Sequence, residues 1–436
     1  MNIGTSSVVS LEKKIAFSTL VQYGGKIVQL VLGIINLRLI ARFLSMHEYG
    51  VYAAITEYAL FFSVAANLGL FAYLVRRISD QPKDGQVFFN ALILRVVTAL
   101  VFFVIAIVSA LFVQNEPLFL IGTVLFLSAL LADFVTTICD AFLQANYLMG
   151  RATFALLLGK IVYSGALLFL LTNQPVIETA SVLMVLGVTI LSSLVTMWLS
   201  LFYVRQKIKW QWQIVWAELW TILKVSLPFG IINIVNALYF RFLPDYFAYI
   251  LLDKASFSAF SIAFKIAQVA SLFSTFLMFS VLPGFRKYID DQHWQKARKL
   301  YRDITRILSG LALFVFIFGS LGATTLISFL ADKKYIIEQY WFMFPAMLLL
   351  AAISYGYDLV LITLFALGQE RWFLKRELIA LAIALVILLL ATQLTDNIWQ
   401  LGAIIVAAIS AETVIVVLGY QKAHRLLHDK ELNHSF

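Results

Sequence analysis

Apolar stretches of about 20 residues recur along the whole chain and are separated by short polar connections. A run of roughly 18 or more mostly apolar residues can cross a hydrocarbon core of ~30 Å as an α-helix, because each residue adds ~1.5 Å. The pattern therefore predicts an all-α integral membrane protein with about twelve transmembrane helices. The predicted spans are residues 15–37, 50–73, 87–113, 118–145, 153–172, 180–204, 227–252, 257–283, 304–330, 339–367, 376–394 and 400–420.

Composition supports this prediction. Hydrophobic residues make up 62% of the chain, charged residues 13%, and the mean hydropathy is +0.90, which lies outside the range of soluble domains. The net charge of +9 would indicate nucleic acid binding in a soluble protein. Here the basic excess lies in the connections, at the level of the lipid headgroups, so membrane lipids are the expected partners and nucleic acid is not.

The sequence shows no signs of enzymatic chemistry. The single cysteine, Cys139, lies within the fourth predicted span, so neither a disulfide framework nor a cysteine metal site is expected. Neither a Gly-rich phosphate loop nor a metal-ligand spacing is present. We therefore expect no cofactor, no metal and no catalytic residue, and expect that the protein is not an enzyme.

The connection at residues 205–226 divides the predicted spans into two sets of six. It places Trp212, Trp216 and Trp220 four residues apart on one helical face, a pattern typical of an amphipathic helix in the headgroup zone. The predicted domains are an N-terminal lobe (1–204), a cytosolic linker (205–226), a C-terminal lobe (227–420) and a cytosolic tail (421–436).

The two lobes resemble each other in sequence. Leu44–Tyr58 (LSMHEYGVYAAITEY) aligns with Leu252–Ile266 (LDKASFSAFSIAFKI) at a constant offset of 208. A weaker match gives Asp140 in span four and Asp358 in span ten similar positions in the two halves. Because each lobe has an even number of spans, both lobes enter the membrane from the same side. We expect a pseudo-twofold axis along the membrane normal and a central cavity between the lobes.

Several spans carry polar residues on one face. A charged residue near the centre of a lipid-facing helix costs on the order of 2.5–3.5 kcal/mol, so these stripes should face a water-filled cavity. Spans one, four and eight each present such a stripe, and Lys26, Asp133 and Lys265 are their clearest members. The candidate substrate-binding residues are Gln22, Lys26, Gln29, Arg95, Lys160, Arg241 and Lys265.

Three of these cations have another interpretation. Arg95 and Lys160 are close enough to the cytosolic side for their side chains to reach the headgroups. Arg241 has Asp245 four residues later and is a candidate for simple pairing.

The acids within the spans are either carriers of a coupling ion or static partners of the bases. Asp358 and Asp140 rank first for coupling because they recur in both lobes, and Asp133 and Glu57 are the further candidates. Pro244 and Pro345 are expected to interrupt spans seven and ten.

Leu39–Tyr52 (LIARFLSMHEYGVY), followed by the triplet Asn67, Leu68 and Gly69, resembles the opening of bacterial polysaccharide flippases of the O-antigen (Wzx) type. These belong to the multidrug, oligosaccharidyl-lipid and polysaccharide (MOP) exporter superfamily. The resemblance implies two six-helix lobes around a hydrophilic cavity that opens alternately to each side of the bacterial inner membrane. Ser45 stands where this family usually has glycine, and His47 where it commonly has an acid.

The resemblance also implies a substrate: an oligosaccharide repeat unit linked to undecaprenyl pyrophosphate, destined for lipopolysaccharide O-antigen or capsule. Lysine and arginine would bind its phosphates, and hydroxyl and amide side chains its sugars. A polysaccharide polymerase and a chain-length regulator are the implied protein partners.

Other functions remain open. A cation-coupled multidrug antiporter of the same superfamily is the first alternative, and a peptidoglycan-precursor flippase, which usually carries two further helices, is another. A membrane glycosyltransferase or polysaccharide polymerase is less favoured, because such enzymes need a sizeable extracytoplasmic loop and the outer connections run to about a dozen residues.

The distribution of basic residues predicts the orientation. With a cytosolic N-terminus, the inner segments hold 22 lysines and arginines and the outer connections hold 5. Because basic loops resist translocation, both termini should be cytosolic. Reporter fusions at Gln174 and Asp396 should therefore report an extracytoplasmic location, and a cytosolic signal at both would contradict this topology.

Overall fold

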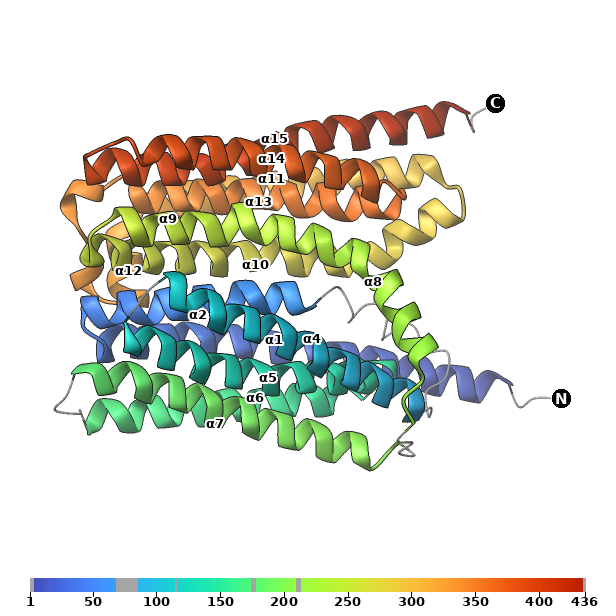
Figure 1. Ribbon diagram of the computed structural model, residues 1–436. Helices are drawn as coiled ribbons and strands as arrows, with labels where there is room; N and C mark the ends of the chain where they lie inside the picture. Colours follow the sequence, from blue (N-terminus) through green and yellow to red (C-terminus); the bar gives the residue numbers. More distant parts are fainter. Residues whose placement is uncertain are drawn as a thin grey trace. The chain divides into compact units, whose positions relative to one another are not determined.

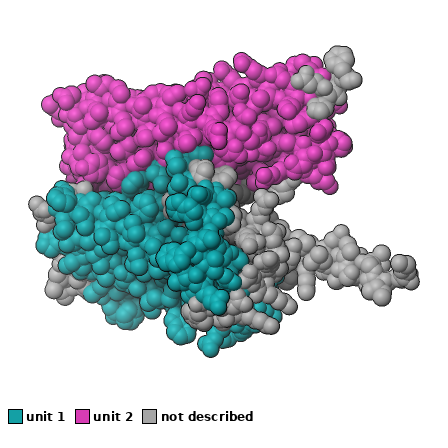
Figure 2. All heavy atoms as spheres, turned by 45° about the vertical axis from the view of Figure 1, so that its right-hand side comes forward, with its two compact units in different colours: residues 1–234 teal, residues 235–436 magenta. Residues whose placement is uncertain are grey.

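The computed structural model consists of α-helices joined by short connections (Figure 1). It describes residues 4–67, 85–113, 116–146, 148–173, 178–208 and 213–433, and no β-strand occurs in these ranges. The chain divides into two compact units, Met1–Ile234 and Val235–Phe436, which we call the N-terminal and C-terminal units (Figure 2).

The N-terminal unit contains seven described helices, the last of which continues into the C-terminal unit. They are α1 (Gly4–Phe43), α2 (Met46–Asn67), α4 (Gly85–Val113), α5 (Pro117–Ala145), α6 (Met149–Thr172), α7 (Glu178–Arg205) and α8 (Trp216–Ala237). The unit boundary therefore lies within α8.

The C-terminal unit begins with the end of α8, which leads directly into a π-helix. Its further elements are η1 (Leu238–Phe242), α9 (Leu243–Leu251), α10 (Lys254–Asp290), α11 (Trp294–Leu321), α12 (Ala323–Leu330), η2 (Lys333–Tyr335), η3 (Glu338–Tyr340), α13 (Met343–Ala366), α14 (Glu370–Ala391) and α15 (Asn397–Asn433).

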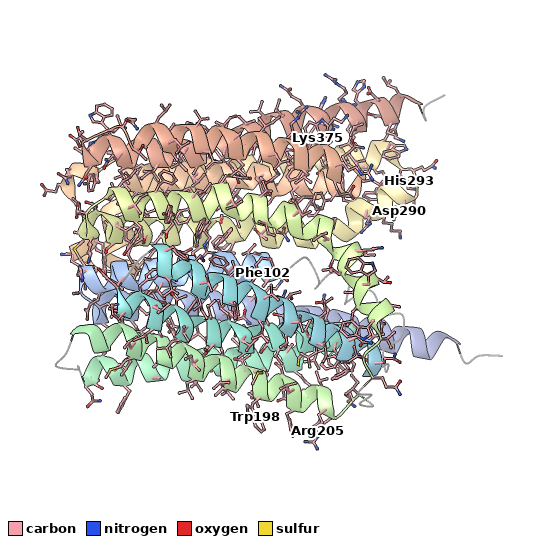
Figure 3. The ribbon with its side chains drawn as sticks, viewed as in Figure 1. Phe102, Trp198, Arg205, Asp290, His293 and Lys375 are labelled. Atoms are coloured by element: carbon pink, nitrogen blue, oxygen red, sulfur yellow. The ribbon has the colours of Figure 1, made fainter. Side chains whose placement is uncertain are left out.

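The helices have the dimensions of membrane spans, which confirms the predicted fold class. Ten described helices are long and apolar enough to cross a bilayer, and the bent pair Trp216–Leu227 and Gly230–Leu251 makes an eleventh. The predicted span 376–394 overlaps α14, which is not among these helices because several charged residues lie in its first turns. Exposed apolar side chains cover the spans. Trp198, for example, is 73% exposed and points away from the helices in Figure 3, as expected of a surface that faces lipid.

The two units have the same internal order of packing. In the N-terminal unit, α5 packs against α2, α4 and α7, and α6 packs against α1 and α7. In the C-terminal unit, α13 packs against α10, α11 and α15, and α14 packs against α15 and α9. The packing of α5 in the N-terminal unit thus corresponds to that of α13 in the C-terminal unit.

The helices that carry the sequence repeat begin at equivalent positions. α2 starts at Met46 and α10 at Lys254, which are 208 residues apart. Ser45 and Glu48 form a capping box: the Ser45 hydroxyl accepts the Glu48 N–H (3.2 Å), and the Glu48 carboxylate accepts the Ser45 N–H (2.7 Å). Asp253 caps α10 by accepting two backbone N–H groups.

The start of α8 is fixed to the N-terminal unit by Asn90, a fully buried residue of α4. The Asn90 side-chain oxygen accepts the Val215 N–H (3.1 Å), and its amide nitrogen donates to the Glu218 carboxylate (2.7 Å). A side chain from α4 thereby holds both the residue before α8 and a carboxylate of its first turn. The helix expected within 205–226 begins only at Trp216, and Trp212 lies outside the described residues.

The two prolines expected to interrupt spans have different effects. Pro244 follows the π-helix η1, in the first turn of α9. Pro345 lies in the first turn of α13, where no intrahelical hydrogen bond is lost, so α13 runs unbroken from Met343 to Ala366. The interruption predicted for Pro345 is therefore wrong.

Asp253 joins the start of α10 to α15, because its carboxylate also accepts from the Asn397 amide (3.0 Å). Burial disfavours its charge, but hydrogen bonds from Ser256 and the Ala255 N–H prevail and hold the pKa of Asp253 below its usual value. Asp253→Ala should lower the free energy of unfolding by about 1 kcal/mol at neutral pH. Because the folded pKa is depressed, this contribution is present above the unfolded pKa of about 3.9 and is lost as pH falls through the folded value.

Unfolding in detergent between pH 7 and pH 3 measures this difference. Asp253→Asn, which retains the capping oxygen, should lie between wild type and Asp253→Ala. A gap between wild type and the alanine variant that stays constant down to pH 3 would contradict this assignment.

Candidate functional site

The C-terminal unit buries a group of polar residues drawn from five elements, which we call the carboxylate–tyrosine cluster. It consists of Asn236 at the end of α8, Tyr239 in η1, Tyr357 in α13, Glu377 in α14 and Glu412 in α15. Tyr239 and Glu377 are fully buried, and Glu412 is 1% exposed. A polar group so deep in an apolar unit is tolerated only where hydrogen bonds replace water.

Hydrogen bonds connect all members of the cluster. The Tyr357 hydroxyl donates to Glu377 Oε1 (2.8 Å), and the Asn236 amide donates to the Tyr239 hydroxyl (2.7 Å). The Tyr239 hydroxyl lies 3.4 Å from Glu377 Oε1 and 3.3 Å from Glu412 Oε2. Its single proton can serve one carboxylate at a time, so Tyr239 bridges the two acids and can switch between them.

The cluster has two acids and no base. Among the described residues, no lysine, arginine or histidine forms a hydrogen bond or ion pair with Glu377 or Glu412, and Glu377 Oε2 is buried without a partner. Two carboxylates in this setting repel each other, and one proton or one monovalent cation relieves the repulsion. The described residues contain no group of three acids, histidines or cysteines suited to a metal ion. When both acids are ionised, the arrangement therefore favours binding of one positive charge.

Close helix packing brings the cluster together. A Cβ atom on Gly356 would lie 2.7 Å from Val416 Cγ1, and a Cβ on Gly419 would collide with Val360. These reciprocal contacts let α13 and α15 approach closely, next to Tyr357.

Tyr239 lies in a π-helix. The five residues of η1 contain one turn with an extra residue, directly before Pro244, whose ring cannot continue a regular ladder of hydrogen bonds. Such π-turns are frequent at functional sites. η1 also carries the sequence-predicted Arg241, which is half-buried.

Asp358, the leading prediction for coupling, follows Tyr357 in α13 but accepts its hydrogen bonds from a different helix. Its Oδ2 accepts from the hydroxyls of Ser274 (2.5 Å) and Thr275 (2.8 Å), both on α10. Neutral hydroxyls can stabilise either charge state of a carboxyl group, because each can donate or accept. A role in ion coupling stays a prediction, now with a defined environment.

The N-terminal unit brings together two further predicted residues. Asp133 on α5 is hydrogen-bonded by Ser193 of α7, and Lys160 of α6 is close enough to interact with its charge. Asp140 lies two turns further along α5, and its Oδ1 is buried without a hydrogen-bond partner. Glu57 is buried within α2 and is 2% exposed.

The remaining predicted cations are distributed over both units. Lys26 and Gln29 on α1 are half-buried, as is Lys265 on α10, and the side chain of Gln22 lies outside the described residues. Gly25, beside Lys26, packs so closely on Thr153 of α6 that a Cβ would collide with it.

Arg95 has a structural environment. It is 2% exposed, donates to the Ala66 carbonyl at the end of α2 (3.1 Å), and stacks over the Phe134 ring (3.9 Å to the centroid). A guanidinium group that donates to a carbonyl oxygen and stacks on an aromatic ring replaces part of its lost hydration. Arg95 presents almost no surface to a ligand in this conformation.

Sequence reasoning missed Glu377 and Tyr239. Glu377 follows Lys375 and Arg376, so it reads as part of a cytosolic charge run, although it lies inside the predicted span 376–394. A signal was available in the sequence: an acid within a predicted span.

Comparison with known proteins places the chain in a family. A family profile described as polysaccharide biosynthesis protein matches residues 11–289. No curated protein sequence matches the chain significantly.

Solved structures share the fold at low identity. A multidrug resistance MATE family transporter of the MOP superfamily, in an inward-facing conformation, has a TM-score of 0.68 and 12% identity, covering 94% of this chain and 98% of its own. A MOP superfamily transporter from Pyrococcus furiosus has a TM-score of 0.67 and 13% identity, covering 96% of each chain. The Vibrio cholerae MATE transporter VcmN has a TM-score of 0.67 and 16% identity, covering 97% of this chain and 98% of its own.

A double-mutant cycle tests whether the cluster acts as a unit. Tyr239→Phe and Glu412→Gln should each destabilise the protein, with an interaction energy of about 0.5–3 kcal/mol between them, because both changes disrupt the same network. The measurement is the free energy of unfolding in detergent. Tyr239→Phe combined with Asp303→Asn, at an exposed position on α11, should be additive within about 0.5 kcal/mol. Additivity in both cycles would mean that Tyr239 does not bridge the acids.

Proposed function

Because the chain belongs to the polysaccharide biosynthesis protein family and has the fold of MOP superfamily transporters, we propose that it is a flippase for lipid-linked oligosaccharides. It moves a repeat unit attached to undecaprenyl pyrophosphate across the bacterial inner membrane, with both termini cytosolic, for assembly of O-antigen or capsule. The observation that carries this substrate class is the family match over residues 11–289.

The polar chemistry of the spans supports a substrate with phosphates and hydroxyls. Lys26, Gln29 and Lys265 are half-buried on predicted membrane spans, so their polar groups are partly accessible to a ligand. A pyrophosphate accepts charge-assisted hydrogen bonds from lysine, and sugar hydroxyls exchange hydrogen bonds with glutamine.

We assign energy coupling to the buried acids of the C-terminal unit, Glu377, Glu412 and Asp358. Uptake of one proton or monovalent cation removes one of the two negative charges of the ionised carboxylate–tyrosine cluster and frees the Tyr239 hydroxyl from one of its two acceptors. Because Tyr239 lies in η1, which directly follows α8, this change acts on the connection between α8 and α9. The ion is released when the cluster becomes accessible to the opposite side.

A multidrug antiporter is the second candidate, and the similarity to MATE transporters favours it. The two functions assign opposite effects to the cations Lys26 and Lys265. In a flippase, the cations bind the substrate phosphates. In an antiporter for cationic drugs, the same cations would repel the substrate, so the lysines separate the two functions.

The test is transport in proteoliposomes containing the purified full chain. Wild type should flip a lipid-linked oligosaccharide, and an imposed proton or sodium gradient should raise the rate by roughly tenfold. Glu412→Gln and Asp358→Asn should lose the response to the gradient, whereas Asp303→Asn should keep it. Lys26→Ala and Lys265→Ala should slow flipping at normal protein abundance.

Each outcome decides between the functions. Exchange of an organic cation for protons, with no movement of the lipid-linked sugar, would replace the flippase with the antiporter. Flipping that ignores every gradient, or a Glu412→Gln variant that responds as wild type does, would remove the coupling role of the cluster.

A further inference from the structure

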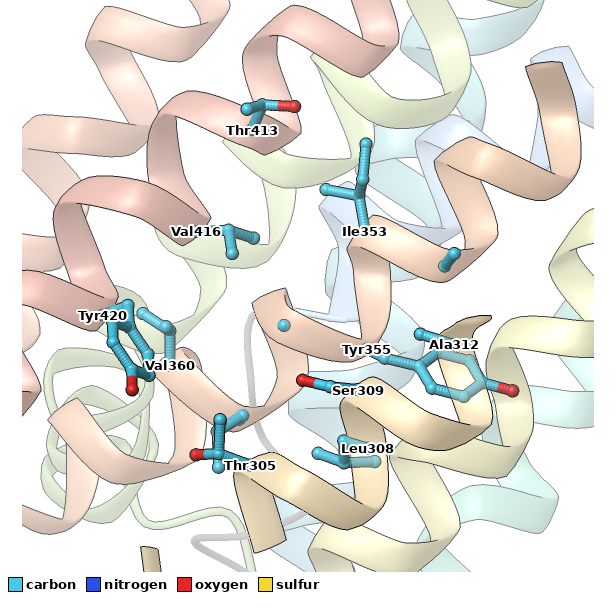
Figure 4. Close-up of a pocket in the computed structure, with 13 residues that line it drawn as sticks. Thr305, Leu308, Ser309, Ala312, Ile353, Tyr355, Val360, Thr413, Val416 and Tyr420 are labelled. Atoms are coloured by element: carbon cyan, nitrogen blue, oxygen red, sulfur yellow. The ribbon is translucent and has the colours of Figure 1, made fainter. Parts of the chain in front are cut away.

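A groove opens between α11, α13 and α15 of the C-terminal unit, and no residue of the carboxylate–tyrosine cluster lines it (Figure 4). Its volume is about 490 Å³. Leu308 and Ala312 line it from α11, Ile353 and Val360 from α13, and Val416 from α15. The hollow is mostly apolar and is not part of the proposed coupling site.

The side of α11 next to the groove faces lipid. Leu313 and Phe314, which directly follow Ala312, are 58% and 56% exposed, and Leu311 is 38% exposed. Large apolar side chains exposed in this number on a membrane span indicate contact with hydrocarbon. The groove is therefore within reach of an acyl chain from the bilayer.

One end of the groove becomes polar and basic. Tyr420 lines this end, and its ring begins a row along α15: Tyr420 to His424 (6.2 Å between centroids) and His424 to His428 (6.4 Å). Arg425 and the acid Asp429 lie beside these residues on the surface of α15. Arg425 is exposed and carries a permanent charge.

The neighbouring helix adds a further cation at this end. Tyr301 of α11 packs against Tyr420 (5.8 Å between centroids), and the next residue, Arg302, is exposed. An apolar hollow that leads to arginine and histidine side chains at the end of a membrane span complements an amphiphile with an anionic head.

We propose that this groove binds an anionic phospholipid, with one acyl chain along Ala312, Ile353 and Val416 and the phosphate at Arg425 and His424. Guanidinium groups bind phosphate oxygens through paired hydrogen bonds, and histidine supplies a further N–H donor. By the charge distribution of the sequence, the lipid belongs to the cytosolic leaflet. The proposal requires only that the chain spans a membrane, not that it flips a sugar carrier.

Photo-crosslinking tests the site in the full-length protein, reconstituted in phosphatidylcholine with a trace of phosphatidylglycerol that carries a diazirine on its acyl chain. Peptides containing residues 305–312, 353–360 and 413–420 should be labelled, and unlabelled phosphatidylglycerol should compete while phosphatidylcholine should not. Arg425→Gln should lower labelling about fivefold. Ala312→Trp, which fills the groove, should abolish it. Leu313→Trp, at the adjacent lipid-facing position, should not.

Several results would overturn the proposal. If phosphatidylcholine competes as well as phosphatidylglycerol does, the anionic head has no role. If the Ala312→Trp and Leu313→Trp variants are labelled equally, the acyl chain of the lipid does not lie in the groove. Competition by a polyprenyl phosphate but not by phosphatidylglycerol would identify a different occupant. If Ala312→Trp does not yield a monodisperse protein, Ala352→Phe on α13 fills the same groove and carries the same expectation.

Discussion

The cost of removing ionised groups from water governs where the charged residues of this chain can lie. In a membrane helix bundle each buried charge needs replacement partners, or it destabilises the protein by several kcal/mol. Arg95 finds two of them in the Ala66 carbonyl and the Phe134 ring, although its Nε is buried without a partner, and Asp358 finds them in two hydroxyl groups. Glu377 is hydrogen-bonded by Tyr357 and Tyr239. Glu412 is hydrogen-bonded by Tyr239 and Ser354, so the fold gives both acids neutral partners only.

The two units share a scaffold but differ in the chemistry that it carries. Both α2 and α10 begin with a side-chain cap at the same repeat position, and both central helices, α5 and α13, touch the same set of counterparts. On α5 the acid Asp133 lies near Lys160, whereas Asp358 and Glu377 beside α13 are hydrogen-bonded by neutral hydroxyl groups. The same scaffold thus surrounds its buried acids with different partners in the two units.

Hydropathy was sufficient to predict the fold class, and the offset of 208 predicted the equivalent helix starts, because both depend on local sequence. The polar interior could not be predicted in the same way. Glu377 was hidden beside Lys375 and Arg376, and only the packing of α14 against η1 and α15 shows that its side chain turns inward. The environment of Arg95 depends on the approach of the Ala66 carbonyl and the Phe134 ring, and the π-turn at Tyr239 depends on how Pro244 is accommodated. These are properties of tertiary contacts, which a linear pattern does not contain.

The glycine contacts between α13 and α15 have a mechanical consequence. With Gly356 against Val416 and Gly419 against Val360, the two backbones interlock at two levels, and no flexible side chain lies between them to absorb a small displacement. Sliding of α13 along α15 by less than a helical turn would drive the methyl groups of Val360 and Val416 into the opposing backbone. The two helices should therefore move together as one rigid body. Any bending of the C-terminal unit is then expected elsewhere, at η1, where the regular helical hydrogen-bond pattern is interrupted.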